Sequence, residues 1–306
     1  MKTPVLFVAA VATLVLMPAP APAQSRASGK THIRQIFVSV TDTEGVPIKG
    51  LSAADFSVTE GGERRTVSHA GQANEPMRIA LMLDTSEAAA PSVTHLRSGL
   101  VLFLDALPPD DEVMLVTTGR QVRVRTPPTT DREKLKALAA GLFADGGSTR
   151  LMDGLLEVDE RFFRKAEGRW PVFVVFTSDG SETSAGAREG EFTKWTLVLG
   201  PRGITAHALV LKSFKARGLP EAIGIPEIVA ENIAQNSGGV YEVMNTTTGL
   251  PDRMKALGET LARAHRNMSG WYAVDIQTAA TDFKAVAVDV ARDGVLLQVS
   301  ERRRGQ

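Results

Sequence analysis

The sequence predicts an α/β fold, a doubly wound and mostly parallel six-stranded sheet (Rossmann-like), with a small β domain formed from the N- and C-terminal segments. Two observations predict it. Between residues 77 and 269, apolar runs alternate with amphipathic helical patterns, as in a parallel sheet covered by helices on both faces. Towards both ends, short β-like runs separated by turn residues replace that pattern.

Residues 1–23 have the layout of a secretory signal peptide. Lys2 precedes an apolar run over residues 5–17, and Ala-Pro-Ala at residues 21–23 is a small-residue cleavage site. The apolar run is too short to cross a membrane, and no later run reaches the roughly 20 apolar residues that a spanning helix requires. We therefore expect a secreted or periplasmic protein with no membrane span.

The N-terminal β segment is predicted over residues 32–72. Its three β-like runs, IFVSV, FSVTE and TVSHA, are separated by turn-rich pieces such as Asp42-Thr43-Glu44-Gly45 and Glu60-Gly61-Gly62. A polar connector at residues 71–76 then leads into the α/β part of the chain.

Six runs predict the strands of the main sheet, within a domain over residues 77–269. Five are apolar and predict buried strands, at residues 79–83, 113–116, 172–176, 206–211 and 240–243. The run at residues 122–124 alternates between valine and arginine, and we expect it to form an edge strand.

Apolar residues at spacings of three and four predict the helices that cover this sheet. The three clearest stripes are Leu96, Leu100, Phe103 and Leu107; Leu151, Leu155, Val158 and Phe162; and Leu250, Met254, Leu257, Leu261, Ala264 and Met268. A further helix is predicted over residues 226–235, before Gly238 and Gly239, which tolerate the left-handed conformation of a helix C-terminus.

The C-terminal β segment is predicted over residues 270–303. Its runs WYAVDI, AVAVDV and VLLQV alternate or are apolar, and Asp293-Gly294 between the last two predicts a hairpin. We expect this segment to pair with the N-terminal β unit, so that both chain ends contribute to one β domain.

The composition limits the chemistry of the protein. Without cysteine, the chain has no disulfide, and any metal must be held by oxygen or imidazole. The 35 basic and 35 acidic residues balance, which argues against a nucleic-acid partner. Because a Gly-x-Ser-x-Gly elbow, a His-Glu-x-x-His helix and a Walker loop are absent, we expect no enzyme and no catalytic residue. His207, inside an apolar run, is predicted to be a buried and hydrogen-bonded core residue.

Two aspartates follow predicted strands and indicate a binding site. Asp84 comes directly after the first strand of the main sheet, and Asp179 follows the run VFVVFTS. Ligands of open α/β sheets bind outside the carboxyl ends of the strands, where the strand order reverses. If the two strands are neighbours, both carboxylates face one crevice. Together with the hydroxyls of Ser86 and Thr149, they are hard oxygen donors suited to Mg²⁺.

The chain resembles the von Willebrand factor type A (VWA) domain, in particular the bacterial secreted group called VWFA-related. The run VSVTDTEGVPIKGLSAADFSVTEGG resembles the N-terminal β segment of that group, and LMLDTSEAA, DGGSTRLMDGL and FTSDGSETS resemble its three metal loops. AENIAQNSGGVYEV resembles the penultimate helix and strand, and residues 271–299 resemble the closing β segment. The order and spacing of these motifs carry the resemblance.

This resemblance implies a strand order of 3-2-1-4-5-6 and a metal-ion-dependent adhesion site (MIDAS). Ser86 and Thr149 would bind Mg²⁺ directly, and Asp84 and Asp179 mainly through water. The family pattern Asp-x-Ser-x-Ser has a second serine where this chain has Ala88, which offers no oxygen. Because glutamates are mostly exposed, Glu87 is expected to be a solvated loop residue rather than a substitute ligand.

Two interpretations of the site stay open. In one, a water occupies the coordination position lost at Ala88, and the site binds Mg²⁺ weakly. In the other, the metal site is vestigial: Asp84 and Asp179 bind backbone amides, and Ser86 caps the following helix.

We expect a non-enzymatic adhesion or binding module that recognises a protein or extracellular ligand, with an acidic group of the partner completing the metal shell. The alternative is a metal-independent scaffold or interaction domain. A hydrolase or phosphotransferase acting through Asp84 is the least favoured class.

Overall fold

The computed structural model of the chain describes residues 31–164, 168–184, 188–212, 225–279 and 283–301. The predicted signal peptide at residues 1–23 lies outside these ranges. Residues 31–306 form one compact unit that contains two six-stranded sheets. The division into segments at 32–72, 77–269 and 270–303 therefore stays a prediction.

The main sheet has the strand order β6-β5-β4-β7-β8-β9. Its strands are β4 (Met77–Leu83), β5 (Glu112–Thr118), β6 (Val122–Thr129), β7 (Trp170–Ser178), β8 (Thr205–Leu211) and β9 (Tyr241–Met244). Neighbouring strands pair in parallel except β5 and β6, which are antiparallel. The sheet is therefore mixed, with an antiparallel edge strand, and numbering its strands along the chain gives the order 3-2-1-4-5-6.

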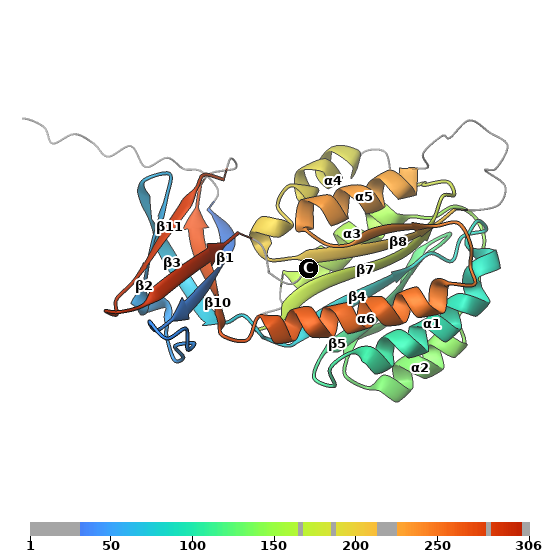
Figure 1. Cartoon of the computed structure of the whole chain (residues 1–306). Coiled ribbons are helices and arrows are strands. Elements are labelled where there is room, and N and C mark those ends of the chain that lie inside the picture. Colours follow the sequence, from blue (N-terminus) through green and yellow to red (C-terminus); the bar gives the residue numbers. More distant parts are fainter. Residues whose placement is uncertain (1–30, 165–167, 185–187, 213–224, 280–282, 302–306) are drawn as a thin grey trace, which may run out of the picture. The chain divides into compact units, whose positions relative to one another are not determined.

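Helices cover both faces of the main sheet (Figure 1). On one face lie α1 (Val93–Ala106), α2 (Arg132–Ala140) and α6 (Leu250–Asn267), and on the other lie α3 (Leu151–Val158), α4 (Glu189–Thr196) and α5 (Ile225–Ser237). Alternate side chains of β4 pack in two hydrophobic cores, one on each face of the sheet. Leu81 packs with the first group of helices, and Met82 packs with the second. None of the described helices has the length and apolar character needed to cross a membrane.

The apolar stripes in the sequence do not predict two of the helices that cover the main sheet. α2 and α4 bury few apolar side chains, Leu135 and Ala139 in the first and Phe192 and Trp195 in the second. The stripe at residues 151–162 is also not one regular helix, because α3 continues as a π-helix over Asp159–Phe163. Short helices with a narrow buried face give too weak a periodic signal to be recognised.

The second sheet joins strands from both chain ends. Its order is β11-β2-β3-β10-β1-β12, with every neighbouring pair antiparallel. The strands are β1 (His32–Thr41), β2 (Phe56–Glu60), β3 (Glu63–Gln72), β10 (Trp271–Thr278), β11 (Val286–Val290) and β12 (Leu296–Ser300). The expected pairing between the N- and C-terminal segments is therefore present.

The hairpin predicted at Asp293-Gly294 is wrong. Gly294 adopts a left-handed turn conformation with φ of 70°, but β11 pairs with β2 whereas β12 pairs with β1. Val288 of β11 and Leu297 of β12 nevertheless pack on the same hydrophobic core. β11 therefore extends one edge of the sheet at β2, and β12 extends the other edge at β1. A hairpin in which these two strands paired only with each other would extend neither edge.

A buried ionic cluster ties this sheet together. Glu60, with no exposed surface, accepts hydrogen bonds from Arg34 at 2.5 Å and from the Thr278 hydroxyl at 2.7 Å. Arg65 donates at 3.0 Å to Oε2, the oxygen that also accepts from Thr278, whereas Arg34 donates to Oε1. Because an unpaired buried charge is strongly destabilising, this carboxylate links β1, β2, β3 and β10.

His207 is buried in β8, as the sequence predicts. The Val240 amide donates to its Nδ1 at 3.1 Å, but its Nε2 is buried without a hydrogen-bond partner in the described part of the chain. The expectation of a fully hydrogen-bonded histidine is therefore only half correct. Burial lowers the pKa of His207 from 6.5 to about 4.

We expect acid to destabilise the fold through His207. Between pH 6.5 and about 4, the unfolded chain binds a proton at this imidazole that the folded chain excludes. The contribution of His207 to the free energy of unfolding should therefore be fully present above the pKa of the unfolded chain. The free energy of unfolding should then fall by about 3 kcal/mol as the pH decreases through this range. Urea unfolding at a series of pH values measures this fall.

The matched variant is His207→Asn, which keeps an acceptor for the Val240 amide and does not titrate. Its unfolding free energy should decline less than that of the wild type over the same pH range, since only the other titrating groups remain. Parallel pH profiles for the two proteins would contradict the assignment to His207.

Candidate functional site

The candidate site lies where the strand order of the main sheet reverses. β4 and β7 are parallel neighbours, with Leu83 in register with Phe176. The chain leaves β4 towards β5 on one side and leaves β7 towards β8 on the other. Asp84 and Asp179 directly follow these two strands, so their loops start side by side at the position where open α/β sheets bind ligands.

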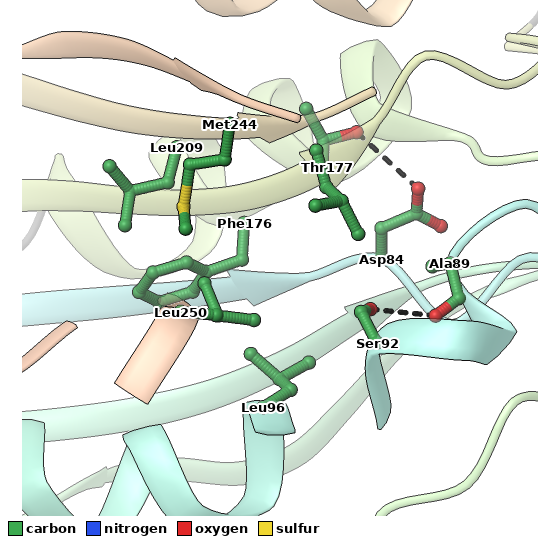
Figure 2. A pocket seen from close by; sticks show the side chains of 10 residues that line it. Asp84, Ala89, Ser92, Leu96, Phe176, Thr177, Leu209, Met244 and Leu250 are labelled. Carbon is green, nitrogen blue, oxygen red and sulfur yellow. Dashed lines mark hydrogen bonds between the residues drawn. The ribbon is translucent and has the colours of Figure 1, made fainter. Parts of the chain in front are cut away.

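Asp84 joins its own loop to the end of β7. The residue is 2% exposed, and its Oδ1 accepts a hydrogen bond from the Ser86 amide at 2.8 Å. Its Oδ2 accepts from the Ser178 amide at 3.0 Å and from the Ser178 hydroxyl at 2.6 Å. Thr177 lies 3.5 Å from the same oxygen (Figure 2). The carboxylate is therefore held by protein donors from its own loop and from the end of β7.

Ser86 presents a buried hydroxyl without a partner. The residue is 1% exposed, and its Oγ makes no hydrogen bond within the described residues. The helix cap expected in the vestigial interpretation is therefore wrong for this hydroxyl. Since a buried polar group left unsatisfied costs about 1–3 kcal/mol, the Ser86 hydroxyl could accept a group from outside the described residues.

Thr149 is fully buried, and its hydroxyl is oriented by the end of β5. Its Oγ1 donates to the Thr118 carbonyl at 2.6 Å. A hydroxyl that donates in this way keeps its oxygen lone pairs for a cation. Gly146 and Gly147, with φ of 73° and 70°, form the turn before it, and the Glu87 amide donates to the Gly147 carbonyl at 3.0 Å.

Asp179 begins the third loop. It is half-buried, and its amide donates to the Leu211 carbonyl at 3.2 Å. Ala88 lies against the same loop, because a Cβ added to Gly180 would come within 2.6 Å of the Ala88 Cβ. Position 88, where the sequence lacks a hydroxyl, is therefore packed between the Asp84 and Asp179 loops. Glu87 is exposed, as expected for a solvated residue.

A small apolar cavity lies behind Asp84 (Figure 2). Leu96, Phe176, Met244 and Leu250 point into it from four elements, with Asp84 at its polar edge. It encloses about 20 Å³, far below the roughly 300–1,000 Å³ of pockets that hold small molecules. This cavity is therefore too small to hold a small-molecule ligand.

These oxygen donors fit a hard cation that takes only a few of its ligands from the protein. In the described residues, no three histidines, aspartates or glutamates gather where they could hold a metal. As the resemblance to the VWA motif implies, direct contacts would come from the Ser86 and Thr149 hydroxyls, with Asp84 and Asp179 acting through water. Mg²⁺ commonly retains several waters in such a site. The protein would supply fewer oxygens than the full motif because of Ala88.

Part of the chain matches a known family. Residues 79–182 match the family model of the von Willebrand factor type A domain, and this range includes the Asp84, Thr149 and Asp179 loops. The resemblance noted from the sequence is confirmed over these residues. None of the curated proteins matches the chain.

Similar chains are also found among the solved structures. A von Willebrand factor type A protein from Catenulispora acidiphila is 13% identical with a TM-score of 0.50, and the match covers 78% of this chain and 52% of that one. The chain thus spans about half the length of that structure. BatB from Bacteroides thetaiotaomicron is 16% identical with a TM-score of 0.46, over 61% and 98% of the two chains.

A third neighbour is proximal thread matrix protein 1 from the mussel byssus, described with a zinc-occupied MIDAS motif. It is 15% identical with a TM-score of 0.47, and the match covers 61% of this chain and 48% of that one. The zinc is a property of the mussel protein. At these identities, the similarity concerns the fold alone.

Sequence reasoning missed Ser178, which gives Asp84 two of its hydrogen bonds. Replacing Ser178 by alanine removes the hydroxyl that donates to the buried Asp84 carboxylate. We expect Ser178→Ala to lower the free energy of unfolding by about 1.5–3 kcal/mol, as for other hydrogen bonds to charged groups. Denaturant titration measures this loss.

The control is Ser181→Ala, since Ser181 is exposed and lies three residues further along the chain. This change should alter stability by less than about 0.5 kcal/mol. Equal effects of the two changes would contradict the role given to Ser178.

Proposed function

We propose that this chain, which carries a von Willebrand factor type A domain, is an exported non-enzymatic binding module. It recognises a protein or other extracellular ligand at the loops that bear Asp84, Ser86, Thr149 and Asp179. A weakly bound Mg²⁺ joins the domain to an acidic group of the partner. In this proposal, residues 1–23 are the signal peptide, residues 77–269 the VWA domain, and the terminal segments one accompanying β domain.

The buried Ser86 hydroxyl is the observation that carries this proposal. It has no hydrogen-bond partner in the described residues, although the backbone beside it is fixed by Asp84. The Thr149 hydroxyl has its proton directed to the Thr118 carbonyl. The Thr149 oxygen is thus prepared to accept rather than donate, and the Ser86 oxygen is available beside it, which suits a cation.

The binding role follows from the kinds of side chain that the loops offer. They are two hydroxyls and two carboxylates, of which the Asp84 carboxylate already accepts from the Ser86 and Ser178 amides. A bound Mg²⁺ here would supply a positive charge with open coordination positions. A carboxylate from a partner is the natural ligand to fill one of them.

The alternative is a metal-independent scaffold or interaction domain. It is favoured by the Asp84 carboxylate, whose two oxygens are both occupied by amides and by the Ser178 hydroxyl. Such a carboxylate stabilises the loops without a metal. Ala88, packed near Gly180, would then be one element of a closed apolar contact.

Metal titration by calorimetry distinguishes the two functions. We expect the wild type to bind Mg²⁺ or Mn²⁺ at millimolar concentrations, and chelator to abolish capture of a partner. Ala88→Ser restores the missing hydroxyl and should raise the affinity roughly tenfold, equal to about 1.4 kcal/mol. Asp84→Ala should abolish metal uptake, and Asp84→Asn tests the loss of charge with less change of shape.

Ser181→Ala serves as the control, since this side chain is exposed on the loop of Asp179, and it should bind metal as the wild type does. If neither the wild type nor Ala88→Ser binds either cation, the metal-dependent function is excluded. Partner capture that persists in chelator would then favour the scaffold.

A further inference from the structure

The N-terminus of α3 has no cap of its own. Arg150 occupies the N-cap position and makes no side-chain capping bond, whereas serine, threonine, aspartate or asparagine usually stand there. The first amides of a helix have no partner within it and favour a negative group nearby. For α3, that group comes from the loop that begins at Asp179.

Glu182 supplies the missing cap. Its Oε2 accepts a hydrogen bond from the Leu151 amide at 2.9 Å, and its Oε1 accepts from the Ser184 amide at 2.8 Å. Ser184 extends the cap, because its hydroxyl accepts from the Asp153 amide at 3.0 Å. One half-buried carboxylate therefore fixes both the start of α3 and the fold of its own loop.

The backbone reinforces this connection at Thr149. The Thr149 amide donates to the Ser181 carbonyl at 2.9 Å, and the Thr183 amide donates to the Thr149 carbonyl at 2.9 Å. These two bonds form an isolated parallel bridge between Thr149 and Glu182. The capped helix begins two residues after Thr149, and the capping residue stands three residues after Asp179.

We propose that Glu182 is a positioning residue that holds the Thr149 loop against the Asp179 loop. This inference rests on the proposed function, because its consequence is the placement of the Thr149 hydroxyl relative to the Asp179 carboxylate. Glu182 touches neither the cation nor the partner. It acts through the Leu151 amide and through the bridge beside it.

Such a role matters more in this chain than in one with the full motif. With Ala88 in place of a serine, Ser86 and Thr149 are the two hydroxyls left to bind a cation directly. Thr149 lies on a different loop from Ser86, so the distance between their oxygens depends on how the loops are held. Partners that orient metal ligands typically contribute 10–100-fold to metal affinity.

Amide hydrogen exchange and Mn²⁺ calorimetry on the same variants test the proposal. In Glu182→Ala, the amides of Leu151 and Thr183 should exchange about tenfold faster, because their local opening becomes easier. The Mn²⁺ affinity should fall about tenfold. Exchange in the fully buried strand β8 should stay as in the wild type. Glu182→Gln, which keeps one acceptor oxygen, should be intermediate in both measurements.

The control is Glu157→Gln at the other end of α3, where Glu157 pairs with Arg161; neither exchange nor Mn²⁺ affinity should change. Faster exchange throughout β8 would show general destabilisation and overturn the positioning role. If the wild type binds Mn²⁺ and the Glu182→Ala protein binds it equally tightly, the positioning role is also overturned. A wild type that binds no Mn²⁺ overturns the proposed function and the metal-positioning role with it, while unchanged exchange at Leu151 and Thr183 overturns the loop connection by itself.

Discussion

The hydrogen bonds between the Asp84 carboxylate and Ser178 determine how the candidate site is built. Parallel strands bring the two loops to the same edge of the sheet, but only a specific contact sets one loop against the other. The buried carboxylate does so by accepting from its own loop, at the Ser86 amide, and from the end of β7. The Ser86 amide is held in this way, while its buried hydroxyl has no partner among the described residues.

The other loops are attached to this centre by further polar contacts. The Thr149 loop contacts the first loop through the Glu87 amide and the third through the bridge to Glu182. β5 comes close enough to join them because residue 119 is glycine; a Cβ there would lie 2.6 Å from the Thr85 hydroxyl oxygen. Three loops that are far apart in the sequence therefore form one surface. Compared with the full motif, the candidate site lacks a single oxygen, at Ala88.

Much of this architecture is readable in the sequence because burial leaves a periodic pattern. The apolar runs of β4, β7 and β8 predict central strands, and aspartates at two strand ends predict the location of the site. Ser178 and Glu182 are not recognisable in this way, because their contacts depend on which loops the topology brings together. The predicted Asp293-Gly294 hairpin fails for the same reason, since a local turn signal carries no information about the sheet edges available to each strand.

Whether the unpartnered Ser86 hydroxyl is a metal ligand can be decided by anomalous diffraction from crystals of this protein grown with Mn²⁺. The proposed function requires an anomalous peak in contact with the Ser86 Oγ and the Thr149 Oγ1, with waters between the ion and the carboxylates of Asp84 and Asp179. A site without that peak, in crystals that diffract well enough to show ordered water there, would contradict it. The three loops would then be a closed structural unit of a metal-independent interaction domain.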